Sequence, residues 1–250
     1  MKSDQEIKKL RILSKRYYNL SKSEKSFFNY QDIPKAKNNK FYNFFESYAK
    51  YNYSYINTKC LCNNLNDILL SKVDRFNCEY HLVICKSCGL IRAKKYWDKN
   101  SVIDFYKNHY RKLWGIEDTD LKKNYLFEIN NCSRIWEIVE KYIDLKNLKK
   151  NFIIADIGGG SGGSLDKFKD KFRCILADFD KRLLNYASNK GIETYFGGVE
   201  ELSKNKIQPN LIILSHVIEH WNDFNKEINE LIKSCSLNTF VYIEFPGVDR

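Results

Sequence analysis

The chain has 250 residues, a net charge of +11 and a hydrophobic fraction of 43%, values that fit a folded protein with one full core and a smaller module and exclude a disordered one. No apolar run approaches the roughly 18 residues that cross a bilayer, and the first residues lack the apolar stretch of a secretory signal. We therefore expect a cytoplasmic protein without membrane insertion. The oligomeric state cannot be predicted from these features.

Residues 1–58 are predicted to form a basic helical arm. Residues 1–50 hold 12 Lys or Arg against 5 Asp or Glu, a net charge of +7, with Tyr and Phe interleaved. Such an arm suits RNA. Basic patches are also common on proteins that never touch nucleic acid. The arm therefore leaves a nucleic-acid partner open without favouring it.

Residues 59–112 are predicted to form a zinc-binding module. Cys60-Leu-Cys62 and Cys85-Lys-Ser-Cys88-Gly89 form two close pairs separated by 22 residues. Without an export signal the thiols should stay reduced, and two turns with close thiolates supply the four tetrahedral ligands of structural Zn²⁺. We predict that Cys60, Cys62, Cys85 and Cys88 bind zinc. Replacement of one ligand by Cys78 or His81 and buried free thiols are the alternatives.

Residues 113–150 are predicted to be a helical connection. Four residues within it recur at the spacing i, i+3, i+4, i+7 and predict one buried helix face: Ile135, Ile138, Val139 and Tyr142.

From residue 151 to residue 250 short apolar runs alternate with helical patterns. The expected strands are 152–157, 173–180, 193–198, 210–216 and 239–246, and the expected helices are 164–172, 181–191 and 223–235. Such alternation predicts parallel pairing with right-handed crossovers. The fold class expected is α/β, a Rossmann-like doubly wound, mostly parallel sheet preceded by the zinc module and helices.

Five of the eleven glycines fall between Gly158 and Gly163, directly after the first of these strands. A triphosphate-binding loop needs Lys and Ser/Thr after its last glycine, and this chain has Ser164 and Leu165 there, which excludes that ligand. The spacing G-x-G-x-x-G, with Asp178 as an acid about 20 residues on, fits NAD and S-adenosylmethionine alike. Asp156 favours S-adenosylmethionine, because a carboxylate repels a pyrophosphate and attracts an ammonium and a sulfonium.

The run Asp156-Ile-Gly158-Gly-Gly160-Ser-Gly162 resembles motif I of class I S-adenosylmethionine-dependent methyltransferases. "ILADFDKRLLNYASNKG", "YFGGVEEL" and "LIILSHVIEHWNDF" resemble the following segments of that family in the correct order, over residues 152–247. The resemblance implies S-adenosylmethionine as cofactor, with its ribose on Asp178. The implied binding residues are Asp156, Gly158, Gly160, Gly162, Asp178, Phe179, Val199 and His216.

Three departures from the family stand out. Gly198 replaces an acid that borders adenine, and Asn210 replaces the Asp that opens the fourth strand. The family also adds two strands after "TFVYIEFP", whereas this sequence ends at Arg250. We therefore expect residues 151–250 to be an incomplete methyltransferase domain and the fifth strand to be an open edge.

"VICKSCGLI" followed by "FYKNHYRKLWG" resembles bacterial methyltransferases that carry a small zinc module, many of them in sugar, surface-polysaccharide or secondary-metabolite pathways. This resemblance implies methyl transfer to a small-molecule acceptor, a sugar or sugar-derived metabolite. The alternatives are an RNA methyltransferase that grips RNA with the zinc module and the basic arm, a non-catalytic binding module of this fold, and an NAD enzyme.

His216-Val-Ile-Glu219-His220 follows the fourth expected strand, and ligands of parallel α/β sheets bind at the carboxyl ends of the strands. On a helical turn, positions i, i+3 and i+4 share one face, so all three side chains are expected to converge. Three roles stay open. His220, together with Glu219, acts as a general base; the cluster holds a divalent metal; or the cluster is structural, with His216 packing near the cofactor.

Overall fold

The computed structural model describes residues 39–74, 76, 78–113, 120–145, 147–148, 150–221 and 223–245. They belong to two compact units, one within Met1–Val102 and the other within Ile103–Pro246. Most of the predicted basic arm, residues 1–38, and the end of the chain, 246–250, lie outside the described residues. In the ranges that are described, no helix combines the length and apolarity needed to span a membrane. The predicted domain boundaries after residues 58, 112 and 150 stay predictions.

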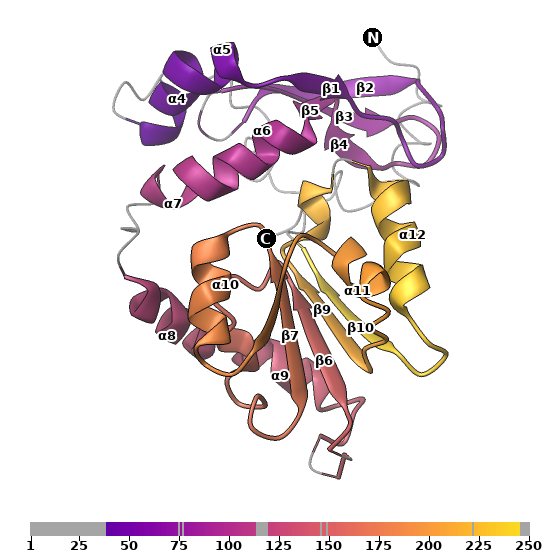
Figure 1. Ribbon diagram of the computed structural model, residues 1–250. Helices are drawn as coiled ribbons and strands as arrows, with labels where there is room; N and C mark the ends of the chain where they lie inside the picture. The colour runs from indigo at the N-terminus through magenta and orange to yellow at the C-terminus, as the bar shows by residue number, and fades with distance from the viewer. Residues whose placement is uncertain are drawn as a thin grey trace. The chain divides into compact units, whose positions relative to one another are not determined.

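The first unit contains a short helical segment and two small antiparallel sheets. The helical segment consists of α4 (Lys40–Phe44), the π-helical turn η2 (Phe45–Ala49) and α5 (Lys50–Asn52). The strands are β1 (Tyr55–Asn57), β2 (Asp67–Val73), β3 (Glu79–Cys85), β4 (Ile91–Ala93) and β5 (Lys95–Trp97). β1 pairs with β5, and β2, β3 and β4 form a meander in that order (Figure 1).

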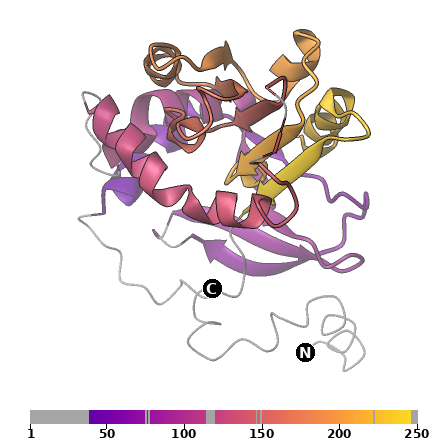
Figure 2. The same ribbon diagram turned by 90° about the horizontal axis from the view of Figure 1, so that it is seen from below.

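The second unit opens with helices. α6 (Lys99–Asp104) leads into it, followed by η3 (Phe105–His109), α7 (Tyr110–Leu113), α8 (Leu121–Asn131) and α9 (Ser133–Val139). Figure 2 shows α8 and α9 running one after the other along the same side of the unit.

The buried face predicted for this helical region is partly wrong. Ile135 and Val139 are buried, but Ile138 and Tyr142 are 42% and 75% exposed. Trp136 takes part in the buried face instead. Its ring packs on Phe168 with centroids 4.2 Å apart, and its Nε1 donates a hydrogen bond to the Ser164 carbonyl at 3.0 Å. A buried indole needs both an apolar contact and a partner for its N–H, and Trp136 finds both on this side of α9.

A parallel sheet forms the core of the second unit. Its strands are β6 (Ile153–Ile157), β7 (Arg173–Asp178), β8 (Glu193–Phe196), β9 (Leu211–Ser215) and β10 (Phe240–Glu244). They lie in the order β10-β9-β6-β7-β8, and every pair is parallel. Asn210, where the resembled family has Asp, still accepts a hydrogen bond from the Ile153 N–H at 2.8 Å. The strand order and the parallel pairing confirm the predicted doubly wound α/β fold class.

Helices cover both faces of this sheet (Figure 1). Successive strand residues point to opposite faces, so Ile154 and Ile213 pack with α9 and α10 (Lys181–Ser188), whereas Ala155 and Ile212 pack with α11 (Glu200–Lys204) and α12 (Phe224–Ser234).

The helix predicted over residues 164–172 is wrong. Only the short 3₁₀ turn η4 (Gly163–Leu165) forms, followed by irregular turns up to β7. The Ser164 carbonyl accepts the Trp136 indole N–H, and the Phe168 N–H bonds to Leu165 rather than to Ser164. An α-helix would need that carbonyl for its own ladder.

Candidate functional site

The strand order creates a switch point between β6 and β9. These strands are neighbours, yet the chain continues from β6 toward β7 on one side and from β9 toward β10 on the other. Ligands of such sheets bind beyond the carboxyl ends of the strands at this point. The glycine loop, 158–163, follows β6, and the histidine segment, 216–220, follows β9. A Cβ on Gly158 would lie 2.8 Å from Val217 Cγ2, so the two segments touch.

The glycine loop is packed tightly against the chain's own atoms. Gly158 and Gly160 have φ of +69° and +63°, a conformation that L side chains rarely adopt. A Cβ on Gly160 would lie 2.4 Å from Glu128 Oε1, and one on Gly159 would lie 2.4 Å from Asp156 Oδ2. The backbone conformation therefore favours glycine at 158 and 160, and a side chain at 159 or 160 would displace a carboxylate that lies against the loop. A close approach to the methionine portion of a cofactor stays a prediction.

Most backbone N–H groups of the loop already have acceptors within the protein. Asp178 Oδ2 accepts from Gly160 N at 3.0 Å. Glu128 accepts from Ser161 N at 3.0 Å and from Gly163 N at 3.0 Å. Gly158 N donates to the Ala177 carbonyl and Gly162 N to the Gly159 carbonyl. The loop therefore resembles a phosphate cradle in sequence, but side-chain carboxylates hold the donors that such a cradle offers.

Asp156 is the third carboxyl group at this loop. It is 3% exposed and accepts a hydrogen bond from the Ser164 hydroxyl. Burial raises its pKa to about 7, and the nearby carboxylates of Glu128 and Asp178 raise it further, while the Ser164 bond opposes them. The carboxyl lies against Gly159 and bonds to Ser164, so Asp156 holds the glycine loop from its buried side.

The end of β7 and the end of β8 bring the predicted adenine and ribose residues together. Asp178 pairs in register with Phe196, and the Phe179 and Phe196 rings lie 5.9 Å apart in an edge arrangement. A Cβ on Gly198 would lie 3.7 Å from Phe179 Cε2. Phe196 is 45% exposed, whereas the Val199 side chain is fully buried in the core. An aromatic surface therefore adjoins Asp178, and only the backbone of Val199 can contribute to it.

His216 turns the chain at the end of β9. Its N–H donates to the Glu244 carbonyl at 2.8 Å, which extends the β9–β10 pairing, and its φ of +56° then reverses the backbone. Its Nδ1 lies 3.3 Å from Glu219 Oε1, and its Nε2 lies 3.7 Å from Glu244 Oε1. Glu244 also accepts from Arg134 Nε at 2.7 Å. Strained non-glycine residues of this kind cluster at functional sites.

His220 faces a different partner from His216. The 3₁₀ turn η5 covers Ile218–His220 only, and His216 precedes it with a φ of +56°, so the segment is not the continuous helical turn that was expected. The Tyr106 hydroxyl lies 3.1 Å from His220 Nδ1 and 3.0 Å from Nε2. Burial lowers the pKa of His220, and the His216 charge acts in the same direction, against Glu219. His220 is therefore neutral near pH 7 and able to accept a proton.

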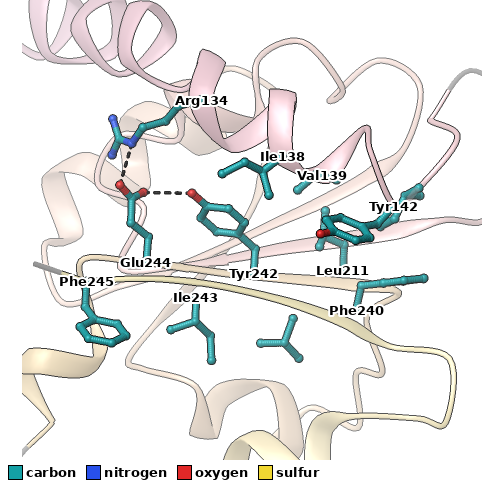
Figure 3. Close-up of a pocket in the computed structure, with 12 residues that line it drawn as sticks. Arg134, Ile138, Val139, Tyr142, Leu211, Phe240, Tyr242, Ile243, Glu244 and Phe245 are labelled. Atoms are coloured by element: carbon teal, nitrogen blue, oxygen red, sulfur yellow. Dashed lines mark hydrogen bonds and ion pairs between the residues drawn. The ribbon is translucent and has the colours of Figure 1, made fainter. Parts of the chain in front are cut away.

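A groove of about 590 Å³ lies between α9 and β10, away from the glycine loop. Its apolar walls include Ile138, Tyr142 and Ile243. Figure 3 shows Arg134, Glu244 and Tyr242 joined at one end of it. Because Glu244 also contacts His216, this polar end adjoins the histidine segment.

The four predicted zinc ligands come together in the first unit. Their Sγ atoms all lie within 4.8 Å of one another, and the short pairs Cys60–Cys88, Cys60–Cys62 and Cys62–Cys85 are 3.3, 3.4 and 3.5 Å apart. A tetrahedral zinc with Zn–S of about 2.3 Å requires S···S distances of about 3.8 Å, so the cluster fits that ion with small outward shifts. Gly89, with φ of +77°, makes the turn after Cys88.

Neither alternative ligand joins this cluster. The Cys78 Sγ lies 3.9 Å from the Phe41 carbonyl, and His81 lies 3.7 Å from Glu79. The cysteine cluster as described is Cys60, Cys62, Cys85 and Cys88, which is the predicted set.

Three site residues were not identified from the sequence. Glu128 reaches the loop from 33 positions upstream, Tyr106 reaches His220 across 114 positions, and Glu244 lies on the neighbouring strand β10. The Tyr-rich helix "FYKNHY" was a visible signal for Tyr106. Nothing in the pattern around Glu128 marks it, because an isolated acid on a helix is most often solvated.

Comparison with known proteins gives likenesses at the level of the fold. No family model matches the sequence, and no curated protein matches it either. A SAM-dependent methyltransferase from Archaeoglobus fulgidus is 18% identical, with a TM-score of 0.38, over 50% of this chain and 58% of that one. The plantazolicin methyltransferase BpumL in complex with SAH is 16% identical, with a TM-score of 0.42, over 57% of this chain and 55% of that one.

This chain thus spans less than two thirds of the length of either protein. Both are methyltransferases, the family that the motifs resemble. Identities and scores this low say nothing about substrate, so function has to follow from the residues of the site.

Proposed function

We propose that the second unit binds S-adenosylmethionine and transfers its methyl group to a small-molecule acceptor, a sugar or sugar-derived metabolite. The observation that carries this proposal is that two carboxylates, Glu128 and Asp178, bond to the glycine loop at the switch point, with the buried carboxyl of Asp156 beside it. A pyrophosphate would meet negative charge there, whereas an ammonium and a sulfonium would be attracted.

The cofactor residues that we propose are those on the β6–β8 side of the edge. When bound, S-adenosylmethionine supplies a methyl group already activated by its sulfonium. Asp178 Oδ2 accepts from Gly160 N and Oδ1 accepts from Asp180 N, which fixes the carboxylate at the end of β7, and a carboxylate there is the acceptor that we propose for the ribose hydroxyls. Phe179 and Phe196 offer an apolar surface for adenine, and the Val199 N–H is the proposed donor to its edge.

The proposed base is His220. A neutral imidazole accepts a proton from an acceptor hydroxyl, and Tyr106 contacts the ring, with its hydroxyl 3.1 Å from Nδ1 and 3.0 Å from Nε2. The rings of Phe105, Tyr106 and Tyr110 pack in edge-on and tilted arrangements beside this histidine, with centroids 4.9 to 5.8 Å apart. Apolar surface with a few polar groups is typical of sites for small organic molecules.

We assign the other predicted parts supporting roles. His216 and Glu219 organise the turn after β9, because each contacts the other and His216 contacts Glu244. Zinc on the four cysteines would be structural, because all four coordination positions are filled by protein thiolates. A cytoplasmic location, where these thiols stay reduced, belongs to the same proposal.

Calorimetry on the full chain tests the cofactor. S-adenosylmethionine should bind and NAD should not; the reverse result would make the chain a dinucleotide protein, and no binding of either would favour a non-catalytic module. Methyl transfer from labelled cofactor should then be measured with free and nucleotide-linked sugars and with mixed RNA in parallel. Transfer to RNA alone, in a salt-dependent complex, would overturn the small-molecule acceptor.

A further inference from the structure

The carboxylate of Glu128, on α8, binds the backbone of the glycine loop at the position where such loops bind anions. Its Oε1 and Oε2 lie 3.0 and 3.1 Å from Ser161 N, and Oε2 lies 2.6 Å from Ser161 Oγ and 3.0 Å from Gly163 N. One carboxylate thus accepts from three donors on two residues. Ser161 is fully buried, so these bonds are shielded from water.

The same donors are those with which glycine loops bind phosphate. In dinucleotide-binding sheets, the N–H groups that follow the second glycine of G-x-G-x-x-G face the pyrophosphate. Here Ser161 N and Gly163 N hold Glu128, and Gly160 N holds Asp178. A phosphate entering this loop would have to displace a bonded carboxylate and would face the charge of Asp178 as well.

Glu128 is held in place by the packing of α8. A Cβ on Gly163 would lie 2.5 Å from the Tyr125 carbonyl and 2.7 Å from Glu128 Cβ, so the helix backbone rests directly on the loop. Tyr125 is buried, and its hydroxyl donates to Asp166 at 2.5 Å just beyond the loop. The carboxylate therefore occupies the loop as a built part of the fold.

We propose that Glu128 is a specificity-determining residue that keeps phosphate-bearing nucleotides out of a loop whose sequence would otherwise admit them. The inference rests on the proposed function in assuming that the loop serves a cationic adenosyl ligand. It goes beyond that function in assigning the rejection of anionic nucleotides to one side chain. Its substrate-class prediction is that removal of the carboxylate converts the loop into a site for a diphosphate.

The test compares Glu128→Ala, Glu128→Gln and a control with the same charge change, Glu140→Gln. Glu140 lies on the surface, paired with Lys167 at 3.1 Å, and does not touch the loop. Binding of ADP and of S-adenosylmethionine to each full-length protein is measured by calorimetry, with a thermal melt to verify folding.

We expect Glu128→Ala to bind ADP at least about tenfold more tightly than wild type, because three donors are vacated and one negative charge is lost. Glu128→Gln keeps an acceptor but loses the charge, so a smaller gain is expected, and Glu140→Gln should equal wild type. Folded variants without any gain for ADP would overturn the inference, and if Glu128→Ala fails to fold, the result with Glu128→Gln decides.

An equal gain in Glu140→Gln would also overturn the inference, because net charge alone would then explain it. Failure of the proposed function is distinguishable: wild type would bind no S-adenosylmethionine, whereas the ADP comparison among the variants would still report on Glu128.

Discussion

The two units of the molecule are stabilised by different means. Of the twelve largest fully buried side chains among the described residues, eleven belong to the unit within Ile103–Pro246 and one, Ile84, to the unit within Met1–Val102. The first unit instead gathers four thiols within 4.8 Å. Hydrophobic burial holds the sheet unit together, whereas the cysteine unit has a smaller apolar core, and a metal on its four thiols would add a cross-link to it.

The largest effect that we expect is from metal removal. Structural zinc contributes about 10–16 kcal/mol to small domains, so chelation should unfold residues 60–91 and leave β6–β10 folded. Hydrogen exchange would locate the loss, and elemental analysis should give one zinc per chain.

Two substitutions sharpen this prediction. Cys60→Ser should abolish zinc binding, whereas Cys235→Ser, outside the cluster, should retain it. Protein purified without chelator and free of zinc, or a sheet unit that unfolds together with the cysteine unit, would contradict the difference between the two units.

If chemistry resides in the sheet unit alone, His220→Ala should lower turnover by ~10²–10⁴-fold and leave the zinc content and the cofactor affinity nearly unchanged. Because the pKa of His220 is lowered, wild-type activity should fall only as pH drops through that lowered value, and the variant should lack this limb. His216→Ala should instead weaken cofactor binding.

His81→Ala is the matched control, since His81 lies in the first unit beside Glu79. Initial rates of methyl transfer, measured from pH 5 to pH 8 for wild type and both variants, test the proposed role of His220. Near-normal turnover of His220→Ala over pH 6–8 would mean that the histidine is structural or that the acceptor needs no base.

Cofactor binding is expected to depend on one acid of the sheet unit and not on another. Asp178→Ala should weaken S-adenosylmethionine binding by about 2–4 kcal/mol, because ribose hydroxyls lose a charged acceptor. Asp170→Ala removes an acid that is 91% exposed on the same unit and should have no effect. Calorimetry with unchanged affinity for Asp178→Ala would remove this residue from the site.

The sequence was most informative where structure follows from neighbouring residues. Strands β6 to β10 begin and end within two residues of the predicted positions, because apolar runs between turn residues suffice to define buried parallel strands. The helix expected over 181–191 begins at Lys181 and ends at Ser188, and Gly191, with φ of +84°, turns the chain toward β8.

The errors and omissions involve partners distant in sequence. The contacts of Trp136 with Phe168 and with the Ser164 carbonyl determine which side of α9 is buried. The hydrogen bond to the Ser164 carbonyl also takes an acceptor that a helix after the loop would need. Glu128 contacts the glycine loop, and Tyr106 contacts His220, only when the chain is folded. Local periodicity carries no information on such contacts, so the site was predicted as segments and not as pairs.

Asp156 is a buried carboxyl group within the sheet unit. The effect of its titration on the free energy of unfolding is the smallest that we predict. Its pKa is raised to about 7 in the folded protein, mainly by burial, against about 3.9 when unfolded. Between these values the folded state holds a proton that the unfolded state has lost, so the free energy of unfolding falls as pH rises. From pH 5 to pH 8 this single group should cost about 2–3 kcal/mol.

Asp156→Asn keeps an acceptor for the Ser164 hydroxyl and removes the titration, so the variant should be more stable than wild type at pH 8 and lose that advantage at pH 5. Asp170→Asn, on the exposed surface, should follow wild type throughout. Hydrogen exchange of the β6 amides at several pH values reports on the sheet unit without interference from zinc loss in the other unit. Parallel curves of unfolding free energy against pH for wild type and Asp156→Asn would show that the buried carboxyl does not titrate in this range. The raised pKa of Asp156 would then be wrong.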